Sequence, residues 1–240
     1  MAAIFYHACM IKAVIFDIDN TLTDFMRTKR AAVDAAVEMM IDAGLKADKE
    51  TMKEKIMKLY FAEGVEDQRI FNKILKQELG QVDMRILAAG IIGYRRAKHG
   101  MFALYPRVST VLFDLRAMGI KMTVLSDAPK LEVWLRIVGL GLHHHFKDII
   151  TSEDFGAKKP DPKPFQAALK VLGTKPAETL MVGDWPERDI VGAKKLGLKT
   201  AWAKYGDTFG TKPGESGADW ELDYISQIPK IIRKENGWKK

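Results

Sequence analysis

The sequence predicts an α/β protein in which a parallel sheet is interrupted by an inserted bundle of helices. Three observations lead to this prediction. A short apolar run at 13–16 ends in an acidic turn at 17–21, helical periodicity extends over about 25–100, and strand-like and helix-like segments alternate after Pro106. Strands separated by helices of about ten residues are joined by right-handed crossovers, so we expect them to run parallel.

The first predicted strand is the run Ala-Val-Ile-Phe at 13–16. A short, continuous apolar run is typical of a strand buried on both faces of a parallel sheet. Ligands of open α/β sheets bind beyond the carboxyl ends of the strands. Asp17 and Asp19 follow directly, so two carboxylates stand where a divalent cation and an electrophile could be bound. The same pattern also occurs in ordinary polar turns, and the rest of the chain must decide between the two.

The helical segment forms the second predicted region. Apolar residues recur at helix spacing, and Gly44, Gly64, Gly80 and Gly100 interrupt the pattern. We therefore expect a self-contained bundle of four helices. The predicted domains are 1–23 with 101–240 for the sheet core, and 24–100 for the bundle. A helical insertion that leaves beside the carboxyl end of a strand is expected to cover the site as a cap.

The remaining elements alternate as a parallel sheet requires. Helices are predicted at 108–115, 129–138, 162–172 and 187–196, and strands at 120–125, 148–151, 179–182 and 199–202. The second strand runs into Ser126, and the strand at 179–182 ends before Gly183 and Asp184. A short helix is expected near 225–233. We find no chemistry in the segment after Gly206.

Four polar groups lie at or beside predicted strand ends: Asp17 with Asp19, Ser126, Lys159, and Asp184 with Asp189. In this order the chain resembles the haloacid dehalogenase-like superfamily of hydrolases. The matching motifs are Asp-Ile-Asp-Asn-Thr-Leu at 17–22, Leu-Ser at 125–126, Lys-Pro-Asp-Pro at 159–162 with Phe165, and Gly-Asp-x-x-x-x-Asp at 183–189. The resemblance covers residue 11 to about 205. It implies a Rossmann-like core with a helical cap between the first and second motifs.

The chemistry of the first motif follows from its two carboxylates. Asp17 is the predicted nucleophile, because a carboxylate can attack phosphorus to form an aspartyl-phosphate. It is also a predicted Mg²⁺ ligand. Asp19 is predicted to protonate the leaving oxygen and then to deprotonate water. The resemblance adds that the backbone carbonyl of Asp19 ligates the metal. Asn20 and Thr21 belong to the same turn, where they either bind phosphate through their N–H groups or serve the turn alone.

The other motifs supply charge and hydrogen bonds. Ser126 is predicted to donate its hydroxyl to a phosphate oxygen, although alone it reads as an ordinary turn residue. Lys159 is predicted to stabilise the charge on phosphorus, and the resemblance favours it over Lys158 because it precedes the proline. Asp184 is a predicted Mg²⁺ ligand. Asp189 is predicted to hold a metal-bound water or to orient Lys159, with a helix N-terminal acid as the alternative.

Several further residues have open interpretations. Trp185 and Arg188 either reach toward substrate or pack. The histidines at 143–145 are interpreted as structural or solvated, because consecutive side chains cannot all face one cation and no Cys or acid completes a site. Basic residues beside the two ends of the insert could bind an anionic substrate tail, but most are expected to be solvated; these are Arg27, Lys29, Arg30, Arg95, Arg96 and Lys98.

The predicted function is a Mg²⁺-dependent phosphomonoester hydrolase acting on a small soluble phosphorylated metabolite. The alternatives are a phosphomutase, in which sugar phosphate replaces water as acceptor, a 2-haloacid dehalogenase, and a non-catalytic nucleic-acid-binding protein. The presence of Asp19 argues against a dehalogenase, because in the superfamily that reaction uses an Asp nucleophile without this second Asp and without a metal. The chemically complete motifs argue against a protein without activity.

Composition narrows the class of protein further. The net charge is +7, but Lys and Arg are spread among acids, so no nucleic-acid partner is predicted. No run of 18 apolar residues is present, so no membrane partner is predicted. A single cysteine, Cys9, excludes an intrachain disulfide and favours a reducing, cytoplasmic compartment. Residues 1–9 are expected to be an extension before a start at Met10. Scarce Asn and Gln with abundant Lys lean toward a thermophilic source.

Overall fold

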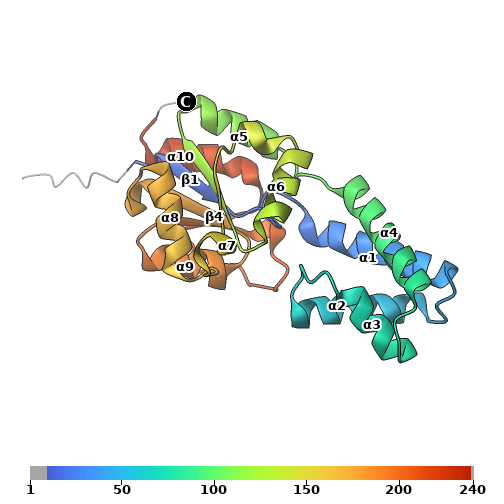
Figure 1. Ribbon diagram of the computed structural model, residues 1–240. Helices are drawn as coiled ribbons and strands as arrows, with labels where there is room; N and C mark the ends of the chain where they lie inside the picture. The colour runs from blue at the N-terminus through green and yellow to red at the C-terminus, as the bar shows by residue number, and fades with distance from the viewer. Residues whose placement is uncertain (1–9, 239–240) are drawn as a thin grey trace, which may run out of the picture. The chain divides into compact units, whose positions relative to one another are not determined.

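The computed structural model describes residues 10–238, and Figure 1 shows its elements. The chain divides into two compact units. The core unit contains the chain up to Asp24 and from Leu104 onward, and the helical unit is Phe25–Ala103. A capping role for the helical unit stays a prediction. The expected extension at 1–9 lies outside the described residues.

Within residues 10–238 the core unit contains one parallel sheet with the strand order β3-β2-β1-β4-β5-β6. The strands are β1 Ala13–Phe16, β2 Lys121–Ser126, β3 Ile149–Thr151, β4 Thr179–Gly183, β5 Lys199–Ala203 and β6 Trp220–Leu222. The sequence did not predict β6. It extends the sheet beyond β5 at one edge.

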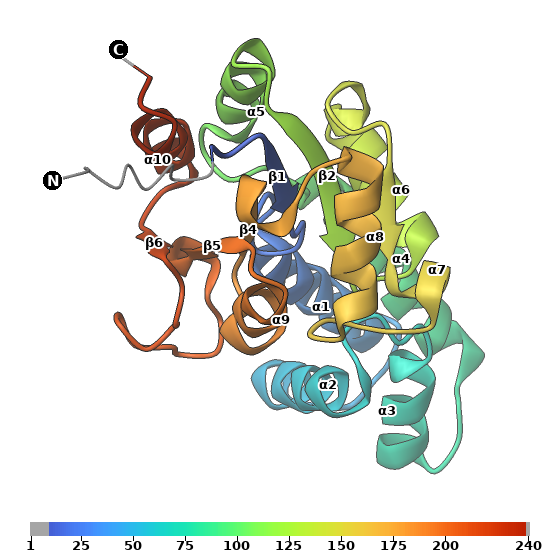
Figure 2. The same ribbon diagram turned by 90° about the vertical axis from the view of Figure 1, so that its left-hand side faces the viewer.

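The sheet is covered by helices on both faces, because successive strand side chains point in opposite directions. In β1, Val14 and Phe16 join the apolar cluster that includes residues of α5 (Val108–Ala117), α6 (Lys130–Gly139) and α10 (Ile228–Glu235). Ala13 and Ile15 join the opposite cluster, with residues of α8 (Pro162–Leu172) and α9 (Val191–Lys195). Figures 1 and 2 show these helices on the two sides of the sheet. The short helix α7 is Ser152–Phe155.

Two predicted helices of the core unit differ from the observed ones. A helical segment is present where one was expected at 187–196, but its first part, Pro186–Ile190, is a π-helical turn, and α9 follows it. The C-terminal helix begins at Ile228, after a turn at Ile225–Gln227, and ends at Glu235. The π-helical turn begins directly beyond the carboxyl end of β4, and π turns often accompany functional sites.

Residues 25–103 are all described and form four helices: α1 Phe25–Asp42, α2 Lys49–Glu63, α3 Ile70–Leu79 and α4 Met84–Met101. Asp48 caps α2 through Thr51 N at 2.8 Å, and Asp83 caps α4. Helices α1 and α4 pack closely, since a Cβ on Gly93 would lie 2.5 Å from the carbonyl oxygen of Ala35. The helical unit has its own apolar core, distinct from the two clusters of the sheet.

Across residues 10–238, no helix combines the length and apolar character needed to cross a membrane.

Candidate active site

Three predicted site residues lie together at the carboxyl ends of the strands, because β2, β1 and β4 are neighbours in the sheet. Ser126 is the last residue of β2, while Asp17 and Asp184 directly follow β1 and β4. The backbone N–H of Asp17 continues the ladder by donating to Val182 O at 2.9 Å. The indole N–H of the fully buried Trp202 donates to the backbone oxygen of Asp184 at 2.9 Å. The sheet therefore holds both carboxyl-bearing positions rigidly.

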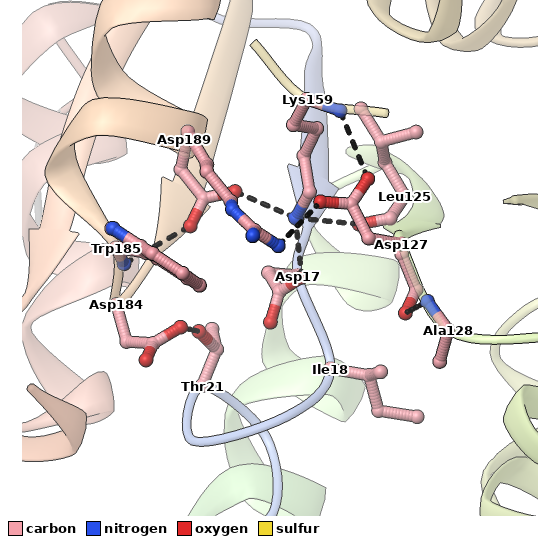
Figure 3. A network of polar contacts seen from close by, with 12 residues as sticks. Asp17, Ile18, Thr21, Leu125, Asp127, Ala128, Lys159, Asp184, Trp185 and Asp189 are labelled. Carbon is pink, nitrogen blue, oxygen red and sulfur yellow. Dashed lines mark hydrogen bonds and ion pairs between the residues drawn. The ribbon is translucent and has the colours of Figure 1, made fainter. Parts of the chain in front are cut away.

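Lys159 connects the first and fourth motifs. Its Nζ lies 2.5 Å from Asp17 Oδ1 and 2.7 Å from Asp189 Oδ1, and it also donates to Leu125 O at 3.3 Å. The three charged side chains are almost completely excluded from solvent. Figure 3 shows the ammonium group between the two carboxylates, with Asp184 beside them. The structure thus brings together residues that are more than a hundred positions apart in the chain.

The backbone of Lys159 is held in place by Asp127, whose Oδ1 accepts its N–H at 2.9 Å. Asp161 follows and caps α8 by accepting from Lys163 N at 2.8 Å. The neighbouring Lys158 is exposed, whereas Lys159 is buried. Of the two lysines, only Lys159 therefore lies in the carboxylate cluster, where the resemblance had placed it.

Asp189 is oriented from both sides. Its Oδ1 accepts from Lys159, and its Oδ2 accepts the backbone N–H of Trp185 at 3.1 Å. Gly183 makes this approach possible, because a Cβ there would lie 2.3 Å from the Asp189 carboxyl group. Of the roles predicted for Asp189, the geometry matches the orientation of Lys159. Both of its oxygens accept from protein donors, and its predicted role in holding a metal-bound water stays a prediction.

Burial dominates the electrostatics of the site. It raises the pKa of Asp17; the charge of Lys159 opposes this rise, while Asp189 and Asp19 reinforce it. Burial likewise raises the pKa of Asp184 well above its usual range, reinforced by Asp17 and Asp189. Burial alone would lower the pKa of Lys159, but Asp17, Asp189 and Asp127 outweigh it and raise that pKa. The cluster therefore carries more acidic groups than its single cation can neutralise.

This excess of carboxylates fits a hard divalent cation, which binds carboxylate and carbonyl oxygens. Asp17 and Asp184 are the side chains that could supply them. Asp184 also receives weak contacts from Asn20 Nδ2 and Thr21 Oγ1, both at 3.5 Å. Among residues 10–238, no group of three or more His, Cys, Asp or Glu side chains is arranged to hold a metal ion. The metal roles of the four aspartates stay predictions: Asp17 and Asp184 through their side chains, Asp19 through its backbone carbonyl as the resemblance implies, and Asp189 through a metal-bound water.

The side chain of Asp19 turns toward α6. Its Oδ1 lies 3.0 Å from Nε of Arg136, which is 2 % exposed. Asp19 itself is partly accessible, with 22 % of its side chain exposed. The sequence did not identify Arg136 as a site residue. A signal was present, because a charged residue at 136 shares the buried face of its helix with Val133 and Ile137.

Ser126 is buried at the end of β2 and makes the turn contact that was its alternative interpretation. Its Oγ accepts the backbone N–H of Ala128 at 3.1 Å. Because the oxygen is the acceptor, this bond does not use the hydroxyl proton. The turn role and the predicted phosphate role are therefore compatible.

The turn after β1 is held by the segment after β5. Asn20 has a left-handed backbone, with φ of 56°. Tyr205 donates its hydroxyl to Thr21 O at 2.8 Å. A Cβ on Gly206 would lie 1.6 Å from Asn20 O, so only glycine fits there. Thr21 N donates within the turn to Ile18 O at 3.4 Å, which favours a structural role for this amide.

Trp185 and Arg188, whose roles the sequence left open, pack against each other. The guanidinium of Arg188 lies 3.7 Å from the Trp185 ring centre. Arg188 also pairs with Asp127 at 3.2 Å, and Trp185 stacks on Phe209 at 4.0 Å. Asp127 therefore joins Lys159 and Arg188, a role that its position after β2 alone did not predict.

The histidine triplet lies in and after a short helical turn at Leu142–His144. The rings of His143 and His144 are 3.9 Å apart. Burial lowers the pKa of His145, and the charges of Arg116 and His144 lower it further. These contacts give the triplet a structural environment.

Known proteins are similar to this chain over most of its length. The sequence model of the haloacid dehalogenase-like hydrolase family matches residues 11–197. The chain is 34% identical over 224 residues to the glyceraldehyde 3-phosphate phosphatase of Methanocaldococcus jannaschii, covering 93% of this chain and 98% of the relative. It is 27% identical to the phosphoglycolate phosphatase of Neisseria meningitidis, covering 94% and 95%.

A solved structure shows the same similarity. The crystal structure of a phosphatase of this superfamily from Thermococcus onnurineus aligns with a TM-score of 0.67 at 26% identity, covering 92% of this chain and 98% of the other. The agreement extends over both units of the chain, because the aligned region is nearly the whole sequence.

Proposed function

Because the chain belongs to the haloacid dehalogenase-like hydrolase family, we propose that it is a Mg²⁺-dependent phosphatase that forms an aspartyl-phosphate on Asp17. One observation carries the proposal: the buried ammonium of Lys159 lies between Asp17 and Asp189, directly beyond the carboxyl end of β1. A nucleophilic carboxylate next to a fixed cation suits attack on an anionic phosphate.

In the first step an oxygen of Asp17 forms a bond to phosphorus, and the bond from phosphorus to the ester oxygen breaks. The leaving oxygen keeps the electron pair and takes a proton from Asp19. Lys159 stabilises the negative charge that builds up on the phosphoryl oxygens, since its ammonium is already 2.5 Å from Asp17. Ser126 supplies a hydroxyl donor to one of these oxygens.

In the second step a water oxygen attacks phosphorus, and the bond between phosphorus and Asp17 breaks. Asp19, now deprotonated, takes the proton from this water and is ready for the next cycle. Asp189 keeps the ammonium of Lys159 in position through both steps. Magnesium, held by Asp17, Asp184 and the Asp19 carbonyl, would supply charge neutralisation for the approach of two anions.

Asp19 separates the proposed reaction from dehalogenation. A halide leaves without needing a proton, whereas an alkoxide leaving group does need one. Asp19 is two residues from the nucleophile and partly exposed to solvent, as a group that exchanges protons with substrate and water must be. This favours phosphate monoesters as substrates.

For the substrate we propose a small phosphorylated metabolite, with glyceraldehyde 3-phosphate as the first compound to test. Relatives of that name match over more than nine-tenths of this chain at 31–34% identity. Phosphoglycolate is the second compound, because the relatives with that name are less similar. Both are alkyl phosphate monoesters.

The test is phosphate release from both compounds and from p-nitrophenyl phosphate, with Mg²⁺ or with EDTA. We expect turnover with Mg²⁺, none in EDTA and none for Asp17→Asn. Equal activity in EDTA would contradict the proposal. Interconversion of glucose phosphates faster than phosphate release would instead favour a phosphomutase.

A further inference from the structure

Arg136 is the only arginine among residues 10–238 whose side chain is buried. It lies on α6 in the core unit, on the face that carries Val133 and Ile137 into the apolar cluster of the sheet. Removing a guanidinium group from water is costly unless a negative charge compensates it. Its burial therefore calls for an explanation.

The compensating charge is Asp19, with Oδ1 at 3.0 Å from Arg136 Nε. The pair is asymmetric, because 2 % of the Arg136 side chain is exposed against 22 % for Asp19. Arg136 is buried in the face of α6, and it meets the carboxylate through an ion pair rather than through an aligned hydrogen bond. Both residues belong to the core unit, so this contact lies within one compact unit of the chain.

We propose that Arg136 is a positioning residue for Asp19 in proton transfer, an inference that rests on the proposed phosphatase function. Proton transfer requires the donor oxygen within hydrogen-bond reach of the ester oxygen, and small displacements are expensive. By holding one oxygen of Asp19, Arg136 keeps the other directed toward the bond that breaks. When the bond from phosphorus to the ester oxygen cleaves, the Asp19 proton goes to that oxygen.

The dependence of the rate on the leaving group isolates this role. An alkoxide is a strong base and must be protonated as it leaves, whereas 2,4-dinitrophenolate leaves as a stable anion. The constant kcat/KM reports phosphorylation of Asp17, so the later attack of water does not enter it. A defect in Asp19 positioning should therefore affect alkyl esters and spare the dinitrophenyl ester.

The main variant is Arg136→Met, which keeps an unbranched apolar stem and removes the charge. For glyceraldehyde 3-phosphate, or phosphoglycolate if it is the better substrate, we expect kcat/KM to fall about 10- to 100-fold. For 2,4-dinitrophenyl phosphate we expect it to stay within about twofold of the wild type, since that ester needs no acid. Arg116→Met is the matched control, because Arg116 is an exposed arginine of α5 in the same unit.

Two further variants keep the inference testable if Arg136→Met does not fold. Arg136→Lys keeps the charge but loses the planar group, so its selective loss should be smaller than that of Arg136→Met. Asp19→Asn should also lose activity toward the alkyl ester and keep it toward the dinitrophenyl ester. The double variant, Asp19→Asn with Arg136→Lys, should hydrolyse the alkyl ester no more slowly than Asp19→Asn alone.

Equal losses for both esters would overturn the inference, because they would indicate a merely structural role. So would unchanged or faster hydrolysis of the alkyl ester by the Arg136 variants. The proposed function fails separately, namely if the wild-type protein shows no Mg²⁺-dependent hydrolysis of any ester.

Discussion

Each unit buries a lysine, and the two lysines have different surroundings. In the core unit, Lys159 lies between the carboxylates of Asp17 and Asp189. In the helical unit, Lys29 is 4 % exposed, donates to Tyr94 Oη at 2.8 Å and to Val65 O, and lies 3.8 Å from the Tyr60 ring centre. One amine belongs to a cluster of acids, and the other packs among aromatic rings.

The proposed reaction uses the charge of Lys159, whereas Lys29 serves the packing of the helical unit. The contacts of Lys29 with rings and a carbonyl oxygen contribute to the core of the helical unit. The core unit instead concentrates Asp17, Asp184 and Asp189 around one cation, which raises the pKa of the first two. Such a cluster contributes little to stability, whereas the proposed reaction requires it.

The largest expected effect concerns Asp17. Asp17→Asn should reduce phosphate release by on the order of 10⁴-fold or more, because the nucleophile is lost. The fold should persist, since Asn has nearly the same shape. Activity is measured as inorganic phosphate and folding by circular dichroism. A variant that retains most of its activity would mean that another group is the nucleophile.

The two lysines can be compared directly. Lys159→Met should lower kcat by about 10²- to 10³-fold through loss of charge stabilisation. Lys29→Met should lower the free energy of unfolding of the helical unit by about 1–2 kcal/mol, through loss of cation–π and hydrogen-bond contacts. Phosphate release and urea unfolding measure the two effects. If Lys29→Met lost as much kcat as Lys159→Met, the two lysines would not differ in the way that their surroundings suggest.

The two units can also be compared through one closely packed glycine in each, Gly183 in the core unit and Gly93 in the helical unit. Gly183→Ala places a Cβ 2.3 Å from the Asp189 carboxyl group, so Lys159 should be displaced and kcat should fall about 10- to 100-fold. Gly93→Ala places one 2.5 Å from Ala35 O in the helical unit, and should cost about 1–3 kcal/mol of stability. Steady-state kinetics and thermal unfolding of both variants test this. Full activity in Gly183→Ala would show that Asp189 tolerates the shift.

The smallest effect is a gain in stability. Because the pKa of Asp184 is raised in the folded protein, this group destabilises the metal-free fold as pH rises from the unfolded value of 3.8 toward the folded one. In EDTA at pH 8, Asp184→Asn should therefore unfold about 2–4 °C higher than wild type. Near pH 4 the two proteins should unfold at the same temperature. Added Mg²⁺ should raise the unfolding temperature of the wild type more than that of Asp184→Asn. A lower unfolding temperature of the variant at pH 8 would reverse the sign and reject this account.

The sequence predicted the strands β1 to β5 from short apolar runs that alternate with helical segments, and it predicted the helical insert from residues that recur at helix spacing. It also identified Asp17, Ser126, Lys159, Asp184 and Asp189, because each follows or lies near an apolar strand. The roles of these residues stay predictions. These residues lie close together because β2, β1 and β4 are adjacent in the sheet. Short motifs alone do not predict this strand order.

What the sequence did not reveal depends on contacts between distant segments. Arg136 was not identified, because a charged residue on an apolar helix face has a role only through the residue that it contacts, here Asp19, and the sequence does not show that contact. Asp127 was not identified either, although its Oδ1 accepts the backbone N–H of Lys159. The strand β6 is short, and its pairing with β5 decides its conformation more than its own residues do.

The placement of the helical unit between β1 and β2 also has a consequence for biosynthesis. β1 leaves the ribosome early, yet its partners are far downstream: Ala13 pairs with Lys121 and with Thr179. The helical unit is one compact stretch of chain, Phe25–Ala103, with its own apolar core, so it is able to fold while the sheet is still incomplete. Nascent chains that end before β4 thus have no Asp184 beside Asp17, so the carboxylate cluster around Lys159 cannot form in them.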